Sequence, residues 1–150
     1  MSTVTATPAA VDPEPAKAPR ASLRVLQVFA VLATLLVLLQ PLLAGMYLSG
    51  SYDMLSAHEV NAFAVTLVGL ALLVAAIVFW ARRGKGWTAL AALGLLVAEE
   101  AQTGFGYERL LGPHIPLGVL IVVGQVLLTM WLFGRRAREP RKPWRRRAAQ

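Results

Sequence analysis

The sequence predicts an all-α protein, a bundle of four transmembrane helices with both ends of the chain in the cytoplasm. Of its 150 residues, 57% are hydrophobic and only 15% are charged. A helix needs about 20 mostly apolar residues to cross a bilayer, and four such runs take up well over half of the chain. Basic residues flank these runs almost entirely on one side. Little sequence is left for a water-soluble catalytic domain, and no catalytic residue is identified.

The first apolar run covers residues 23–48 and follows a tail of different composition. Residues 1–21 are rich in Pro, Ala and Thr and have no apolar period. Such a segment cannot bury enough surface to offset the entropy of ordering, so we expect a disordered cytosolic tail. The apolar run begins too late and is too long for a cleavable signal peptide. We therefore expect it to remain as an anchor, kinked at Pro41, which follows Gln40.

Three further runs complete the predicted transmembrane domain of residues 22–135. They cover residues 60–80, 87–105 and 115–133. The second run ends at a basic loop, and the fourth ends at Arg135 and Arg136. Residues 136–150 are expected to form a basic cytosolic tail, which reaches toward anionic lipid.

The basic residues predict the orientation. Fourteen of the fifteen Lys and Arg residues lie in the N-terminal tail, the loop between the second and third runs, or the C-terminal tail. Only Arg109 lies in the other two connections. The positive-inside rule places both termini in the cytoplasm, which predicts a multi-pass protein of the cell (plasma) membrane. With no folded reading module, nucleic-acid binding is not expected; the expected partners are the lipid bilayer and another membrane protein or redox partner.

The chain contains no cysteine. This excludes disulfides, thiolate catalysis, iron–sulfur clusters and covalently attached c-type haem. A soft-metal site would have to use His, Met or carboxylate ligands.

Polar side chains inside the apolar runs are candidate functional residues, because they are costly at membrane depth. They are Gln40, Asn61, Glu99, Glu100, Gln102 and Gln125. The two consecutive glutamates point about 100° apart on a helix. We expect one to face the bundle and the other to point outward; the alternative is that both snorkel to the interface.

The two histidines are the only ones in the chain, and each opens a helix that enters from the outer side. The predicted topology therefore places His58 and His114 at matching depth. Gly118, one turn below His114, and Gly69, deeper on the other helix, keep side-chain bulk low and leave room for a flat ligand. Two axial imidazoles and an apolar slot suit haem b. The alternative is that both histidines are ordinary interfacial residues.

A weak internal repeat links the two halves. GMYLSGSYDMLSAH (45–58) and GFGYERLLGPH (104–114) each join a helix end to a histidine. Aligning Gly45 with Gly104 places Gln40 opposite Glu99. Two similar hairpins suggest a parallel repeat.

The segment from Gln40 to Gly45, followed by His58 and Ala62, resembles the "Q-x-x-x-x-G … H-x-x-x-A" signature of heme A synthase-type membrane proteins. That family is built from two four-helix bundles, each with histidines opening its second and fourth helices to hold haem. The resemblance covers one bundle and implies that His58 and His114 bind haem. Leu55 stands where the family has its catalytic glutamate, so oxidation of haem is not implied. The chain is also similar to small uncharacterised bacterial four-helix membrane proteins.

These observations favour a membrane protein that binds b-type haem near the outer face and serves in electron transfer or haem handling. Two alternatives stay open. One is a cofactor-free structural or accessory subunit of a membrane complex. The other is a small proton-coupled transporter that uses Glu99 or Glu100.

Overall fold

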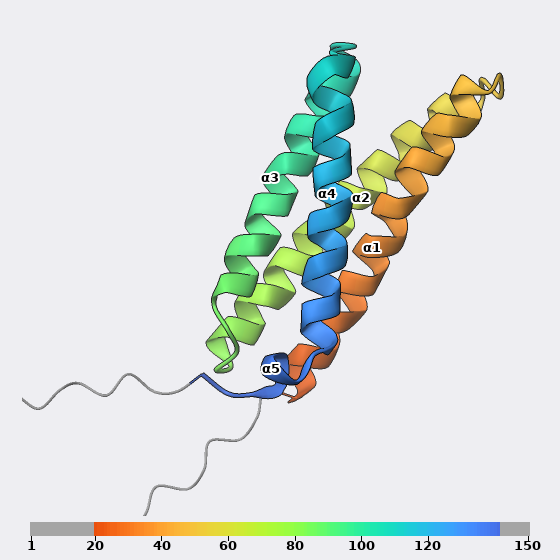
Figure 1. Ribbon diagram of the computed structural model, residues 1–150. Helices are drawn as coiled ribbons and strands as arrows, with labels where there is room; N and C mark the ends of the chain where they lie inside the picture. The colour runs from red at the N-terminus through yellow and green to blue at the C-terminus, as the bar shows by residue number, and fades with distance from the viewer. Residues whose placement is uncertain (1–19, 142–150) are drawn as a thin grey trace, which may run out of the picture.

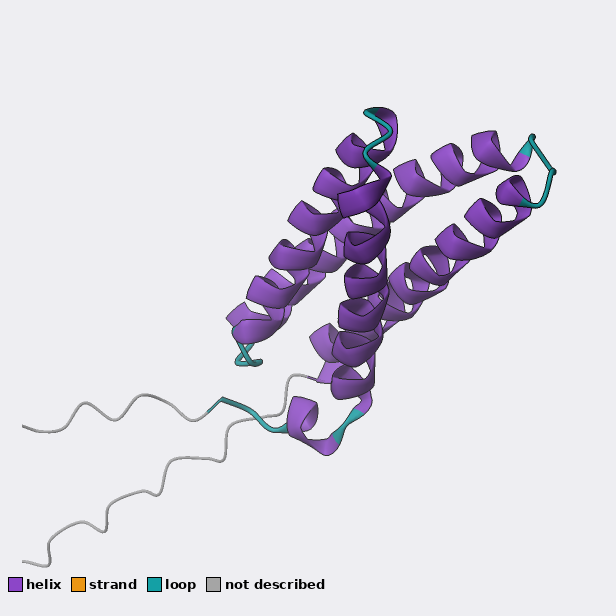
Figure 2. Ribbon diagram, turned by 45° about the horizontal axis from the view of Figure 1, so that its top comes forward, coloured by secondary structure: helices purple, strands orange, loops and turns teal. Residues whose placement is uncertain are grey.

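The computed structural model describes residues 20–141, which fold entirely into helices and connecting turns (Figures 1 and 2). The helices are α1 (Arg20–Leu48), α2 (Met54–Ala81), α3 (Trp87–Tyr107), α4 (Leu111–Phe133) and the short α5 (Arg135–Arg138). No strand occurs in this part of the chain. The predicted all-α class is confirmed.

Three of the helices, α1, α2 and α4, are long and apolar enough to cross a membrane. The protein is therefore helical with membrane-spanning capacity. The predicted third span, α3, is not among the three. Its 21 residues would suffice in length, but Glu99, Glu100 and Gln102 lower its hydropathy in the second half.

The four long helices pack in chain order around a square. Direct packing joins α1 to α2, α2 to α3, α3 to α4 and α4 back to α1, whereas the diagonal pairs do not pack together. The end that carries the α1–α2 and α3–α4 connections is here called the distal end. The opposite end, with the α2–α3 connection, Arg20 and α5, is the basal end. The two hairpins diverge toward the distal end (Figures 1 and 2).

The main hydrophobic core occupies the basal half. Its buried members come from all five helices, and most of them are small: Leu23, Leu26, Ala30, Ala33, Leu72, Ala75, Ala76, Phe79, Ala89, Ala92, Leu128, Leu132 and Ala137. Alanine lets helix backbones approach closely, which is how helices associate when lipid provides no hydrophobic drive. The distal half has a much smaller cluster of Val37, Val65 and Ile121. Tight basal packing and sparse distal packing leave space between the hairpins at the distal end.

A buried polar cluster fixes α1 against α4 in the basal half. Gln125 is fully buried and donates to the Ala30 carbonyl at 3.1 Å, while the hydroxyls of Thr34 and Thr129 lie 2.8 Å apart. Asn61 joins α2 to α1 by donating to the Leu36 carbonyl at 2.9 Å. Interhelical hydrogen bonds of this kind hold membrane bundles together. Two of the polar residues selected from the sequence, Asn61 and Gln125, thus connect helices.

The helices extend beyond the apolar runs. Helix α2 begins at Met54 and α4 at Leu111, several residues before the predicted starts at 60 and 115, so the histidines lie one turn inside their helices. The reason is that hydropathy marks the apolar length, whereas backbone hydrogen bonding continues the helix through polar residues. Residues 20–21 are helical and 135–138 form α5, against the predicted tail boundaries. The rest of both predicted tails, residues 1–19 and 142–150, lies outside the described residues.

Candidate functional site

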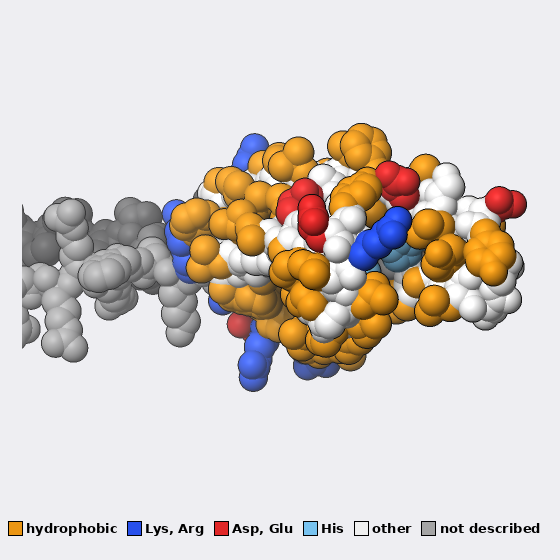
Figure 3. Space-filling view, turned by 90° about the horizontal axis from the view of Figure 1, so that it is seen from above, with side chains coloured by type: hydrophobic (Ala, Val, Ile, Leu, Met, Phe, Trp, Pro, Cys, Tyr) orange, Lys and Arg blue, Asp and Glu red, His pale blue; other side chains and the backbone are white. Residues whose placement is uncertain are grey.

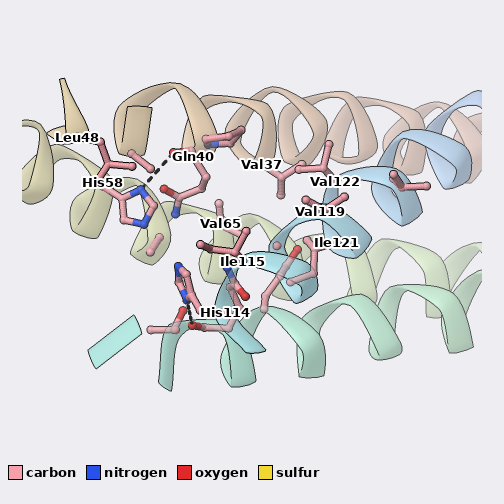
Figure 4. Close-up of a pocket in the computed structure, with 18 residues that line it drawn as sticks. Val37, Gln40, Leu48, His58, Val65, His114, Ile115, Val119, Ile121 and Val122 are labelled. Carbon is pink, nitrogen blue, oxygen red and sulfur yellow. Dashed lines mark hydrogen bonds between the residues drawn. The ribbon is translucent and has the colours of Figure 1, made fainter. Parts of the chain in front are cut away.

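A cavity of about 430 Å³ lies between the two hairpins in the distal half of the bundle (Figure 4). This is within the range of sites that hold small molecules. All four long helices line it, mostly with aliphatic side chains. The polar side chains among the lining residues are Gln40, His58, Glu99, Gln102, Thr103 and His114. Six of the candidate residues selected from the sequence therefore meet at this cavity: Gln40, His58, Glu99, Gln102, His114 and Gly118.

The two imidazoles approach this cavity from α2 and α4, helices that do not pack directly against each other. Figure 4 shows the rings pointing toward one another, with their hydrogen-bonded nitrogens turned away. His58 Nδ1 lies 3.2 Å from the Gln40 carbonyl, and His114 Nδ1 lies 2.9 Å from the Gln102 carbonyl. A carbonyl can only accept, so each bond requires a proton on Nδ1 and leaves Nε2 as a free base. This is the arrangement in which histidine binds metals, with the outer nitrogen oriented by a hydrogen bond.

The side chain of Gln40 adds a second contact to His58. With its amide nitrogen turned toward α2, Gln40 donates to the His58 carbonyl at 3.2 Å, and its oxygen accepts from the Ala62 N–H at 3.0 Å. The same nitrogen lies 2.8 Å from His58 Nδ1. Gln40 thus offers this ring nitrogen an acceptor from its backbone and a donor from its side chain. When the amide donates to the His58 carbonyl, Nδ1 can keep its proton and donate to the Gln40 carbonyl.

The second hairpin repeats the first. Gln102 holds His114, and its amide nitrogen lies 2.7 Å from the position that a Cβ on Gly118 would take. Each half therefore has a glutamine on its first helix, a histidine on its second, and a small residue (Ala62 or Gly118) one turn later. The structure pairs Gln40 with Gln102, three residues beyond the predicted Glu99. The glutamine and the histidine are 18 residues apart in the first hairpin and 12 in the second, because both the helix ends and the connections (residues 49–53 and 108–110) are shorter in the second.

The two consecutive glutamates point in different directions, as expected from the helical period. Glu99 is 5% exposed, and its Oε2 is buried without a hydrogen-bond partner. Glu100 is exposed and accepts a hydrogen bond of 2.8 Å from the Thr66 hydroxyl. The prediction that one faces the bundle and the other points outward is confirmed. The side chain that faces the bundle, Glu99, lines the cavity.

Gly69 and Gly118 leave space for side chains of α3. Glu99 Oε2 lies 2.6 Å from where a Cβ on Gly69 would be, and Gly69 itself does not line the cavity. The space beside Gly69 and Gly118 is thus occupied by Glu99 and Gln102. Sequence analysis missed Gly106, where a Cβ would lie 3.1 Å from His114 Cε1. Its only signal is the packing of α3 against α4, which no local pattern reveals.

The donor set limits the kinds of metal site. Within residues 20–141, no group of three or more His, Cys, Asp or Glu side chains is placed to hold a metal ion. Zinc sites need three or four protein ligands. Two opposed imidazoles over an apolar wall instead suit a cofactor that carries its own equatorial ligands, as haem does.

Comparison with known proteins adds no assignment. No protein-family model matches the chain, and neither a curated protein nor a solved structure matches it. The site is therefore interpreted from its own geometry.

Proposed function

We propose that this protein spans the cell membrane four times and binds b-type haem between His58 and His114, near the outer face, in electron transfer or haem handling. The observation that carries the proposal is the pair of opposed imidazoles, each with Nδ1 directed at a backbone carbonyl. The test is the absorption spectrum of the purified protein with haem supplied. A coloured, low-spin species supports the proposal, and a colourless protein rejects it.

The residues of the site divide the work of holding such a group. His58 and His114 would bind the iron from opposite sides, and Gln40 and Gln102 would fix the two ring orientations. Valines and isoleucines of the cavity wall would exclude water from the macrocycle. When bound, the haem supplies one-electron redox chemistry.

A proton-coupled transporter is the second candidate, and one observation favours it. Glu99 is a buried carboxyl group without a hydrogen-bond partner, on a helix facing a cavity. Ionisable groups at membrane depth are typical of proton relays. Neither this candidate nor the accessory-subunit alternative needs a cofactor. The absorption spectrum therefore separates both of them from haem binding.

The proposed topology is N-in and C-in. Nine of the ten Lys and Arg residues between positions 20 and 141 lie in α1 near its start, the α2–α3 connection, α5 or the residues after it. These all belong to the basal end (Figure 1). Arg109 alone belongs to the distal end. The positive-inside rule then makes the basal end cytoplasmic and the histidine cavity close to the outer face.

A reporter that is active only outside the membrane should give no signal when it is fused to the C-terminus, because the basic basal end stays inside. Insertion of the same reporter between Gly50 and Ser51, in the α1–α2 connection, should give a strong signal and serves as the control. The measurement is reporter activity in intact cells. A strong signal from the C-terminal fusion would refute the four-span topology.

Replacement of Gly106 by Ala should weaken haem binding without abolishing it. The new Cβ would lie 3.1 Å from His114 Cε1 and 3.4 Å from Nδ1, so the ring must shift by a few tenths of an ångström. Mutation of residues that orient metal ligands typically costs about 10- to 100-fold in affinity, and we expect a loss at the lower end of this range. The matched control is Gly104→Ala on the same helix, where a Cβ meets nothing within 4 Å. Equal haem affinity in the two variants would contradict the placement of His114.

A further inference from the structure

The cavity has an opening along the side of the bundle, where lipid would be. Several lining residues are strongly exposed at the molecular surface: Leu48 (82%) on α1, and Ile115 (61%) and Val119 (58%) on α4. Other lining residues, such as Val37 (2%), are buried. The lining residues of α2 and α3 are all buried or half-buried, so the exposed part of the lining belongs to α1 and α4. The opening therefore lies between α1 and α4, distal to Val37.

The opposite side, between α2 and α3, is closed. The Tyr107 hydroxyl donates to Glu59 Oε1 at 2.7 Å, and the Thr66 hydroxyl donates to Glu100 Oε1 at 2.8 Å. These two bonds join α2 to α3 along the distal half. Behind them, Val65 is buried in the cavity wall.

Hydrogen bonds between α1 and α4 lie at the other end of the bundle. In the described residues, those that join the two helices involve α1 positions no further along than Thr34: Gln27, Ala30 and Thr34. Beyond them, Val37 marks the floor of the opening. Among the described residues, no hydrogen bond therefore joins the distal parts of α1 and α4. The gap between them is lined by apolar side chains.

Both walls of the gap belong to helices that can cross a membrane. The residues of the gap are Pro41, Ala44 and Leu48 on α1, and Ile115 and Val119 on α4. All are apolar, as lipid-facing residues must be. From the distal end, a histidine is visible beside a basic side chain and among hydrophobic side chains, with acidic side chains nearby (Figure 3). An apolar molecule dissolved in the bilayer therefore meets an apolar path between α1 and α4.

We infer that the cavity is filled from the bilayer, by a lipid-dissolved molecule that passes sideways between α1 and α4. The inference rests on the proposed function for the identity of that molecule, a haem dissolved in the membrane. The lateral opening itself is independent of haem. The residues of this portal are Pro41, Ala44, Leu48, Ile115 and Val119.

The lipid exposure of the portal can be measured without haem, since the chain has no cysteine of its own. A nitroxide label attached through Ala44→Cys or Val119→Cys in reconstituted protein should collide frequently with oxygen, which concentrates in lipid. It should collide rarely with a water-soluble nickel chelate. Ser51→Cys, in the distal connection, is the control and should show the reverse. Preferential collision with the nickel chelate at both portal positions would overturn the inference, whether or not the protein binds haem.

The passage of haem is tested by closing the portal reversibly. In the cofactor-free double variant Ala44→Cys/Val119→Cys, a short thiol crosslinker with a reducible core should slow haem uptake from liposomes about tenfold or more. Cleavage of the crosslinker should restore it, which shows that the protein is still folded. A bridge at Thr34→Cys/Thr129→Cys, whose native hydroxyls lie 2.8 Å apart below the portal, should not slow uptake.

The outcomes of this second test separate the two claims. Uptake by the bridged protein as fast as by the cleaved protein overturns the portal while haem binding stands. Failure of the wild-type protein to take up haem rejects the proposed function, and the collision measurement then decides the portal alone.

Discussion

Replacement of either His58 or His114 by Ala should abolish the low-spin haem spectrum of the protein. In the proposed site both imidazoles would bind the haem iron, so removal of either would leave the iron with one protein ligand. The wild-type protein, expressed with ample haem, should show a sharp reduced spectrum that does not readily respond to carbon monoxide. Each variant should still insert into the membrane, because insertion depends on the apolar helices and not on the histidines. The measurement is the reduced absorption spectrum of detergent-purified protein.

Gln125→Leu is the matched control for the histidine variants. Gln125 is a buried polar residue of α4, like His114, but it does not line the cavity. Its replacement removes a bond to the Ala30 carbonyl and should leave the spectrum unchanged. If the wild-type protein purifies colourless, the histidines are ordinary interface residues, and the accessory-subunit interpretation takes precedence.

Much of the fold follows from hydropathy and the helical period. Apolar runs located all four long helices, and the 100° step between neighbours separated Glu99 from Glu100. Hydropathy could not locate the helix ends, because α2 and α4 begin in polar segments that precede their apolar runs. Nor does the polar second half of α3 have the composition of a span. The hydropathy pattern indicates which residues can lie in lipid, but it does not indicate where the hydrogen bonds of the helix backbone begin and end.

The candidate site was only partly predictable, because lateral packing decides contacts between helices. The matching depth of His58 and His114 follows from topology, and both do line one cavity. Their partners are backbone carbonyls of Gln40 and Gln102, and a carbonyl leaves no mark in the sequence. The neighbour of Gly69 is likewise not evident from the sequence. Its small size predicts room for a flat ligand, whereas in the structure Glu99 lies beside it.

The burial of Glu99 without a hydrogen-bond partner lowers the stability of the fold, which favours a functional role for this side chain over a structural one. A buried acceptor without a partner destabilises a protein by about 1–3 kcal/mol, and Glu99 Oε2 is such an acceptor. Gly69 provides the space for its carboxylate, so the surroundings accommodate Glu99 without bonding it. A group that costs stability and faces a cavity is expected to act on what enters the cavity.

Replacement of Glu99 by Leu should therefore stabilise the cofactor-free protein, by roughly 1–3 kcal/mol, while it weakens haem binding. Glu100→Leu is the control: it removes an exposed carboxylate and the bond from Thr66, so neither gain nor weaker binding is expected. Unfolding of both variants in mixed micelles and titration with haem provide the two measurements. Destabilisation by Glu99→Leu would mean that the carboxylate holds the bundle together. Stabilisation with unchanged haem affinity would show that Glu99 has no role in haem binding. It would favour the transporter, in which the buried carboxyl group binds and releases a proton.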